Sequence, residues 1–279
     1  MNHPIEHRDN ELYIESVSAA EIAKEFGTPT YIYSKALIEK AFLSYQNILA
    51  SHQGLICYAV KANSNLAILD ILARLGAGFD IVSEGELKRV LAAGGDPKKI
   101  VFSGVGKKPS EMNCALKSDI YCFNVESEAE LTMLNEVSKK IGKTASVSIR
   151  VNPDVNPTTH PYIATGMRKN KFGVPKNEVI KLYELASRLP NISIQGIDCH
   201  IGSQLVDLNP LIESIHQLLE LIDVLQVKGI TLEHINLGGG LGIIYRNEKP
   251  PSIADYVSSI LNELGGQNIK LIIEPGRSI

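Results

Sequence analysis

Four side chains able to do chemistry stand at the ends of short apolar runs: Lys61, Arg150, His200 and Glu274. A lysine amine can attack a carbonyl carbon, and a histidine ring can exchange protons or stack on a flat ligand. Arginine and glutamate bind groups of opposite charge. Burying all four together would be costly without an anionic ligand in the site. The combination therefore indicates a binding site for a charged small molecule, provided that the fold brings these residues together.

The elements that must position these residues form a regular alternation. Eight short apolar runs are separated by stretches of helical character, and they lie at residues 56–60, 78–82, 99–103, 120–125, 146–151, 194–200, 234–237 and 270–273. Strands that alternate with helices are typical of a parallel sheet. Eight of them favour a closed (β/α)8 barrel of the TIM type over an open doubly wound sheet.

The alternation of side chains within the runs predicts which residues point into this barrel. Lys61 shares a face with Cys57, and His200 shares a face with Asp198. The face that carries the smaller residues should point inward, while the bulkier apolar face packs on helices. In such barrels the catalytic residues lie at the carboxyl ends of the strands. We therefore expect Lys61, Arg150 and His200 to converge on one rim.

Local signals mark several of the intervening helices. Ser83 and Ser127 each stand three residues before a glutamate, which is the pattern of a capping box directly after a strand. Asn209 is followed by Pro210. This pair predicts a helix with Asn209 as its N-cap and the proline at its first position. Gly229 predicts the end of the same helix.

Three consecutive glycines, Gly238, Gly239 and Gly240, follow the seventh run, and we call them the glycine loop. Such a loop lets the backbone approach a ligand closely, and barrels of this type often bind phosphate near strands seven and eight. A flexible loop would explain the glycines alone, but Arg277 beyond the eighth run favours a phosphate site. The glycine spacing does not fit a dinucleotide fingerprint.

A lysine that faces an anion site points to pyridoxal 5′-phosphate (PLP). This cofactor needs an amine for its aldehyde, a site for its phosphate and a group that sets the charge of its ring nitrogen. Lys61, the glycine loop and Glu274 meet these three needs. His200 could stack on the ring, and Ser203 could donate to the phosphate.

Composition excludes several other classes of protein. The chain has 279 residues with 28 basic and 31 acidic side chains, a net charge of −3, and no basic block that would indicate a nucleic-acid partner. Its cysteines, Cys57, Cys114, Cys122 and Cys199, lack metal-ligand spacing and are expected to be reduced, with no metal bound. Neither a signal peptide nor an apolar run of about 18 residues is present, so we expect a cytoplasmic protein with no membrane partner.

The two ends of the chain fall outside the alternation. Residues 1–34 contain a lone strand at 11–14 and a short helix at 19–26, and we assign them to an N-terminal segment. Residues 35–279 form the predicted barrel. The sequence ends shortly after the eighth run, so we expect the barrel to lack its last helix. Either the chain is a fragment, or the partner that covers the last strand comes from elsewhere.

Five segments in register resemble a known family: residues 58–63, 78–86, 200–204, 238–242 and 274–277. They resemble the diaminopimelate decarboxylases, which are PLP-dependent fold III enzymes related to alanine racemases and ornithine decarboxylases. The resemblance implies a PLP-binding (β/α)8 barrel that removes CO2 from meso-2,6-diaminopimelate to give L-lysine in lysine biosynthesis. Three alternatives stay open: an ornithine- or arginine-type decarboxylase, a non-catalytic PLP-binding barrel, and a barrel for another phosphorylated ligand.

The resemblance also implies a role for each matching residue. Lys61 would form the Schiff base with PLP, His200 would stack on its ring, and Glu274 would bind the pyridine nitrogen. The other implied cofactor contacts are Asp80, Arg150, Ser203, Gly238, Gly239, Gly240, Pro275, Gly276 and Arg277, with Glu86 in support. Arg277 would also bind a carboxylate of the amino-acid substrate.

The family has a further C-terminal β-domain, with which residues 1–34 would pair. The resemblance implies that the full-length form is a homodimer, and that the second subunit contributes to the site.

Overall fold

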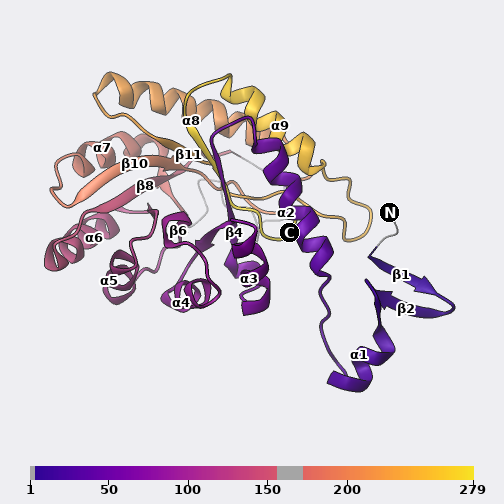
Figure 1. Ribbon diagram of the computed structural model, residues 1–279. Helices are drawn as coiled ribbons and strands as arrows, with labels where there is room; N and C mark the ends of the chain where they lie inside the picture. Colours follow the sequence, from indigo (N-terminus) through magenta and orange to yellow (C-terminus); the bar gives the residue numbers. More distant parts are fainter. Residues whose placement is uncertain (1–3, 156–171) are drawn as a thin grey trace.

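The computed structural model describes residues 4–155 and 172–279 (Figure 1). Within these ranges, eight parallel strands pair in a closed ring, as predicted. They are β4 (Gly54–Ala59), β5 (Gly78–Ile81), β6 (Ile100–Phe102), β7 (Cys122–Val125), β8 (Ala145–Asn152), β10 (Ile192–Asp198), β11 (His234–Asn236) and β12 (Lys270–Ile273). The pairing of β12 with β4 and of β8 with β10 closes the barrel.

Seven of the strands are each followed by a helix outside the barrel. In chain order these are α3 (Leu66–Arg74), α4 (Glu84–Ala92), α5 (Pro109–Lys117), α6 (Glu128–Ile141), α7 (Lys176–Ala186), α8 (Asn209–Val227) and α9 (Ile253–Leu264). Two short 3₁₀ turns, η1 (Val60–Ala62) and η2 (Pro97–Lys99), and a two-residue strand, β9 (Val174–Pro175), also belong to the barrel.

The remaining position in the helical layer is occupied by α2 (Lys35–Leu49), which precedes the first barrel strand. It packs between α9 and α3 and buries Phe42 and Tyr45 in the core (Figure 1). The Tyr45 hydroxyl lies 2.7 Å from Oγ of Ser278, just beyond β12. The cover of the last strand therefore comes from a helix earlier in the chain, which is one of the two possibilities that the sequence left open.

Side chains alternate across the strands as the sequence predicts. Cys57 joins a small apolar cluster with Leu55, Val101, Cys122 and Ile272. The neighbouring residues on β4, Ile56 and Tyr58, instead belong to the larger core between strands and helices. Two apolar layers thus hold the strands from both sides, and the inward residues at the carboxyl ends are left to form a site.

The two predicted capping boxes are only half formed, because the carboxylates of Glu86 and Glu130 accept from the amides of Val82 and Glu126 and not from those of the N-cap serines. The hydroxyls of Ser83 and Ser127 accept from the backbone three residues ahead, at the starts of α4 and α6. Gly229, with φ of +79°, follows the last residues of α8 as expected. The expected N-cap at Asn209 was wrong: α8 already includes Asn209, and Leu208 precedes it without a side-chain cap.

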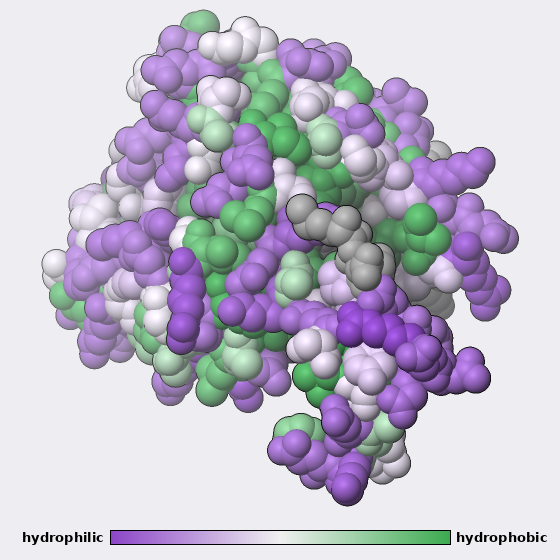
Figure 2. Space-filling view, turned by 45° about the vertical axis from the view of Figure 1, so that its right-hand side comes forward, coloured by the Kyte–Doolittle hydropathy of each residue, from purple (hydrophilic) through white to green (hydrophobic). Residues whose placement is uncertain are grey.

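The N-terminal segment forms a unit of its own beside the barrel. β1 (Ile5–Arg8), β2 (Glu11–Ile14) and β3 (Val17–Ser18) make an antiparallel sheet, and α1 (Ala19–Phe26) follows it. The segment stands away from the barrel in the ribbon and projects below the main body in the space-filling view (Figures 1 and 2). Phe26 is 71% exposed and Tyr31 is 91% exposed, so the N-terminal segment carries exposed apolar surface around these two residues. Among the described residues, no helix is both long and apolar enough to cross a membrane.

Candidate active site

A cavity of about 570 Å³ opens at the carboxyl ends of the strands. The predicted site residues that line it are Lys61, Arg150, His200, Ser203, Gly239, Gly240, Glu274, Gly276 and Arg277. Three others lie behind its wall. Asp80 is hydrogen-bonded to Lys61, Gly238 packs against the His200 ring, and the Pro275 carbonyl accepts from the Ala59 amide at 2.9 Å.

Lys61 lies on η1, the turn directly after β4, and its side chain is half-exposed. Its Nζ donates to Oδ2 of the fully buried Asp80 at 2.5 Å. Burial opposes the charge of Lys61, but the carboxylates of Asp80 and Glu274 raise its pKa overall. Burial also raises the pKa of Asp80, and Glu274 adds to this effect. The amine is therefore held at the cavity beside a carboxylate that can take up its proton.

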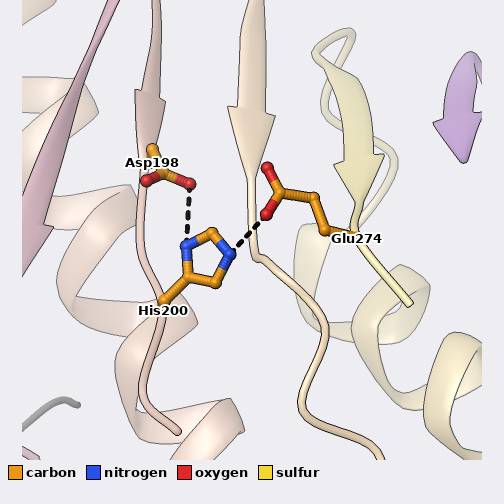
Figure 3. Close-up of side chains that lie close together, drawn as sticks. All are labelled: Asp198, His200 and Glu274. Atoms are coloured by element: carbon orange, nitrogen blue, oxygen red, sulfur yellow. Dashed lines mark hydrogen bonds and ion pairs between the residues drawn. The ribbon is translucent and has the colours of Figure 1, made fainter. Parts of the chain in front are cut away.

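The His200 ring lies between two carboxylates that come from different strands (Figure 3). Its Nε2 is 2.5 Å from Oε2 of Glu274, just after β12, and its Nδ1 is 3.3 Å from Oδ1 of Asp198 at the end of β10. Burial disfavours a charged ring, but Glu274 and Asp198 outweigh burial and raise the pKa of His200 to about 10. Both carboxylates therefore favour the charged form of the ring, the imidazolium.

Glu274 is held by amides from two other strands. Nδ2 of Asn236 donates to its Oε1 at 2.6 Å, and Nδ2 of Asn124 lies 3.5 Å from the same atom. Burial would raise the pKa of Glu274, but the charge and hydrogen bond of His200 lower it overall. The group is thus a fixed carboxylate. Neither asparagine was predicted as a site residue, although both lie near the ends of apolar runs, as Lys61 does.

Arg150 is a buried cation on β8, the strand that pairs with β10. Its Nη1 donates to Oε1 of Glu126 at 2.9 Å, its Nε is 3.9 Å from Asp198, and its guanidinium lies 5.2 Å from the centre of the Phe172 ring. Burial opposes the charge, but Glu126 and Asp198 raise the pKa of Arg150. Glu126 also accepts from the Gly173 amide at 3.0 Å, so it joins this wall of the cavity to the residues that lead into β9.

The glycine loop is packed tightly against its neighbours. Gly238 has φ of +63°, and a Cβ there would lie 2.5 Å from Nε2 of His200. Gly240 has φ of +98°, and a Cβ there would lie 2.8 Å from the Gly202 carbonyl oxygen. Because the loop has no side chains, it leaves room for the His200 ring and also exposes backbone to the cavity.

Arg277 is oriented by two contacts across the mouth of the cavity. Its Nη1 donates to Oε1 of Gln204 at 3.2 Å and to the Tyr245 hydroxyl at 3.0 Å. Gln204 in turn bridges both backbone groups of Ile243. Tyr245 also lines the cavity, and no motif in the sequence distinguished it.

Glu86, which was expected to support the site, lies at the first turn of α4 rather than in the cavity wall. Its Oε2 accepts from the Val82 amide at 2.7 Å, and Val82 lines the cavity. Burial raises the pKa of Glu86. This residue therefore acts on the site through the backbone of the β5–α4 turn.

The charges suit a ligand with an anionic end and a ring nitrogen that can carry a proton. Lys61, Arg150 and Arg277 are cations at the wall and mouth, and Glu274 is a carboxylate at the wall. Among the described residues, ligand atoms of Asp198, His200 and Glu274 lie within 4.8 Å of one another, as a metal ion would require. The charges of the imidazolium, of Lys61 and of Arg150 would repel such an ion.

Comparisons with known proteins agree with this chemistry. Residues 35–279 match the family model described as pyridoxal-dependent decarboxylase, pyridoxal binding domain. The chain is 54% identical to a diaminopimelate decarboxylase of Pseudomonas aeruginosa over 273 residues, which is 98% of this chain and 66% of that protein. The chain spans 65 to 66% of the length of the first curated relatives it matches.

Solved structures give the same result. The crystal structure of diaminopimelate decarboxylase from Helicobacter pylori complexed with L-lysine has a TM-score of 0.90 and 43% identity, over 93% of this chain and 66% of that chain. The enzyme from M. jannaschii in co-complex with L-lysine has a TM-score of 0.92 and 38% identity, over 99% of this chain and 67% of that chain. By sequence and by fold, the chain belongs to the family of pyridoxal-dependent decarboxylases and contains their pyridoxal-binding domain.

Proposed function

We propose that the protein converts meso-2,6-diaminopimelate to L-lysine and CO2 with PLP as its cofactor. The observation that carries the proposal is the meeting of Lys61, His200, Glu274 and Arg277 around one cavity, in a chain 54% identical to a named diaminopimelate decarboxylase. The two related crystal structures that hold L-lysine, the expected product, support the substrate assignment.

The residues present fit the reactive end of PLP. Lys61 extends its amine into the cavity and would hold the cofactor covalently through the aldehyde carbon. Glu274 is a buried carboxylate with a lowered pKa, so it would bind the ring nitrogen and keep a proton on it. His200 and Arg150 form the adjoining walls, where a flat ring could lie against the imidazolium.

The opposite end of the cavity fits a phosphate. The backbone of Gly239, Gly240 and Gly276 lines it, together with Ser203 and Arg277. The crowding at Gly240 means that a side chain there would displace the loop that forms this cradle. Gly238 and Pro275 would contribute by holding the two loops in place.

When bound, the cofactor supplies a conjugated, electron-withdrawing ring that accepts the electron pair released when a carboxylate leaves as CO2. The Lys61 amine must lose a proton before it can bond to carbon, and Asp80 Oδ2 stands 2.5 Å away to accept it. The raised pKa of Asp80 makes it a better base for this transfer than an exposed aspartate would be.

Arg277 would bind a substrate carboxylate. Gln204 and Tyr245 hold its guanidinium in one orientation, so little rotamer entropy is lost when a carboxylate binds. A substrate with two carboxylates, such as diaminopimelate, can lose one as CO2 while the other stays anchored to a cation.

The proposal extends to the assembly. Residues 1–34 would pack with a C-terminal β-domain, and the full-length form would be a cytoplasmic homodimer without nucleic-acid or membrane partners. The separate antiparallel sheet of the N-terminal segment and its exposed Phe26 and Tyr31 support a partner on this side. Chromatography with light scattering on the full-length protein measures the oligomeric state directly.

The test of the activity uses the full-length protein supplied with PLP. We expect equal amounts of L-lysine and CO2 from meso-diaminopimelate, and much slower release of CO2 from L-ornithine or L-arginine. Preference for either of these amino acids would replace the substrate assignment. Borohydride reduction followed by mass spectrometry should place the cofactor on Lys61. Labelling of Lys61 without any CO2 release would indicate a non-catalytic PLP-binding barrel.

A further inference from the structure

Asp198 is a fully buried carboxylate that the roles above leave unused. It is the last residue of β10 and lies on the inward face with His200. Two cationic groups are close to it: Nδ1 of His200 at 3.3 Å from Oδ1, and Nε of Arg150 at 3.9 Å from Oδ2. A buried carboxylate is strongly unfavourable unless a cation neutralises it, so one of these two groups must be its principal partner.

The geometry favours His200 as that partner. Arg150 already has a closer carboxylate, because its Nη1 is 2.9 Å from Oε1 of Glu126. Asp198 lies 3.9 Å from Arg150, which is farther away than Glu126 is, but only 3.3 Å from Nδ1 of His200. In the close-up, the ring spans the gap between Asp198 on one strand and Glu274 beyond another (Figure 3).

An imidazole ring can donate from both nitrogens only when it is protonated. His200 has a carboxylate at each nitrogen, and the backbone of Gly238 blocks movement of the ring on the loop side. The charged groups that face it are Glu274 beyond β12, Asp198 of β10, Arg150 of β8 and Asp80 of β5. Burial and Arg150 oppose a positive ring, and the carboxylates outweigh them.

We propose that Asp198 is a positioning residue for His200: it binds the Nδ1 edge, and so keeps the imidazole charged and fixed at the wall of the cavity. Only the purpose of this positioning rests on the proposed function: a cation beside the bound cofactor would make the cofactor ring more strongly electron-withdrawing. The arrangement itself is a property of the chain without substrate.

The test follows the ionisation of His200 in the full-length protein, without substrate or added cofactor. Histidine labelled at Cε1 with ¹³C gives one NMR signal for each ring, and His200→Gln identifies the signal of interest. In the wild type we expect this ring to stay charged above pH 8. In Asp198→Asn, which keeps the shape and removes the charge, the pKa of His200 should fall by about 1 to 3 pH units. Glu126→Gln is the matched control, because it removes the other carboxylate of Arg150 and should leave the His200 signal unchanged.

The outcomes separate cleanly. A His200 signal in the wild type that titrates near pH 6.5 overturns the proposal, and so does an unchanged pKa in a folded Asp198→Asn protein. An equal fall in Glu126→Gln would assign the effect to Arg150 and also overturn it. If Asp198→Asn does not fold, the smaller Asp198→Ser takes its place with the same two outcomes. Since no step uses diaminopimelate or PLP, failure of the proposed function would leave this result unaffected.

Discussion

Two histidines inside the same barrel have opposite environments. His200, at the carboxyl end, faces two carboxylates, and although burial opposes it they raise its pKa to about 10. His234, the first residue of β11 at the amino end, is fully buried, and neither ring nitrogen has a hydrogen-bond partner among the described residues. Burial and the charge of Lys270 lower its pKa to about 3.

The difference shows how the barrel separates function from stability. Charged groups at the carboxyl end are held in place by one another, at a cost in desolvation that a bound ligand can offset. At the amino end, a buried histidine packs as an uncharged ring beside Tyr121, with ring centres 5.5 Å apart. Substitutions at the carboxyl end should therefore change catalysis first, and substitutions at the amino end should change stability first.

The largest effect is expected from Lys61→Ala. Loss of the amine that would hold the cofactor should reduce kcat/KM for diaminopimelate by at least about 1,000-fold. Lys99→Ala is the matched control: Lys99 donates to the Gly76 carbonyl at 3.1 Å near the amino end, and its loss should change activity by less than about twofold. The measurement is CO2 release from the PLP-saturated protein. More than a tenth of the activity remaining in Lys61→Ala would contradict the role of this amine at the carboxyl end of the barrel.

Glu274→Gln should have the next largest effect. The amide keeps the shape but cannot hold a proton on the ring nitrogen, so kcat should fall by about 100-fold. The same substitution should also lower the pKa of His200, since Glu274 is the strongest of the charges that raise it. Glu233→Gln, at an exposed glutamate beside His234, should leave both quantities unchanged. A kcat within threefold of the wild type in Glu274→Gln would contradict the role of this carboxylate.

His234 should make stability sensitive to mild acid. Its folded pKa of about 3 lies below the ordinary value of 6.5, so the folded state binds fewer protons than the unfolded state. The stability that depends on the neutral His234 ring is fully present above pH 6.5 and is lost as the pH falls toward 3. At pH 5 the loss is about 2 kcal/mol. Urea unfolding at pH 7.5 and pH 5 measures it.

His234→Phe should remove that part of the acid sensitivity, because the replacement ring cannot be protonated. His216→Gln, at an exposed histidine, should retain it. His200 acts with the opposite sign: its raised pKa stabilises the fold at low pH, and this contribution is lost as the pH rises toward 10. Equal acid sensitivity in His234→Phe and the wild type would show that the ring is not neutral and buried.

The smallest effect is expected in the helical layer, from Tyr45→Phe. Removing the hydroxyl that lies 2.7 Å from Ser278 Oγ should lower the free energy of unfolding by about 1 kcal/mol. Activity should not change, since this pair lies outside the cavity. Loss of activity without loss of stability would show that α2 acts on the site rather than on the fold.

Much of the fold could be predicted from the sequence because its signals are local. Each strand is a short apolar run, and the period of two within it already put Lys61, Arg150 and His200 on the inward face. Their meeting in one cavity follows from the shared direction of parallel strands. The strand at 11–14 and the helix at 19–26 were also predicted at the observed bounds. The expectation that this strand stands alone was wrong, since β1 and β3 pair with it.

What the sequence could not provide were partners that depend on tertiary packing. The apolar face of α2 gave no sign that it would fill the gap beside α9. Asp198 and His200 were correctly placed together on the inward face, but the contact of His200 with Glu274 depends on how β10 and β12 line up across β11. The glycine loop was interpreted as room for a ligand, whereas Gly238 also makes room for a histidine ring within the chain.

The position of α2 also sets the order in which the barrel can be completed during synthesis. This helix leaves the ribosome early, but α9 and β12, against which it packs, follow about 200 residues later. Phe42 and Tyr45 therefore cannot complete their packing until α9 and β12 have been made. A circular permutant in which α2 follows β12 would make the closing contacts between neighbouring segments, and it should refold faster than the natural order.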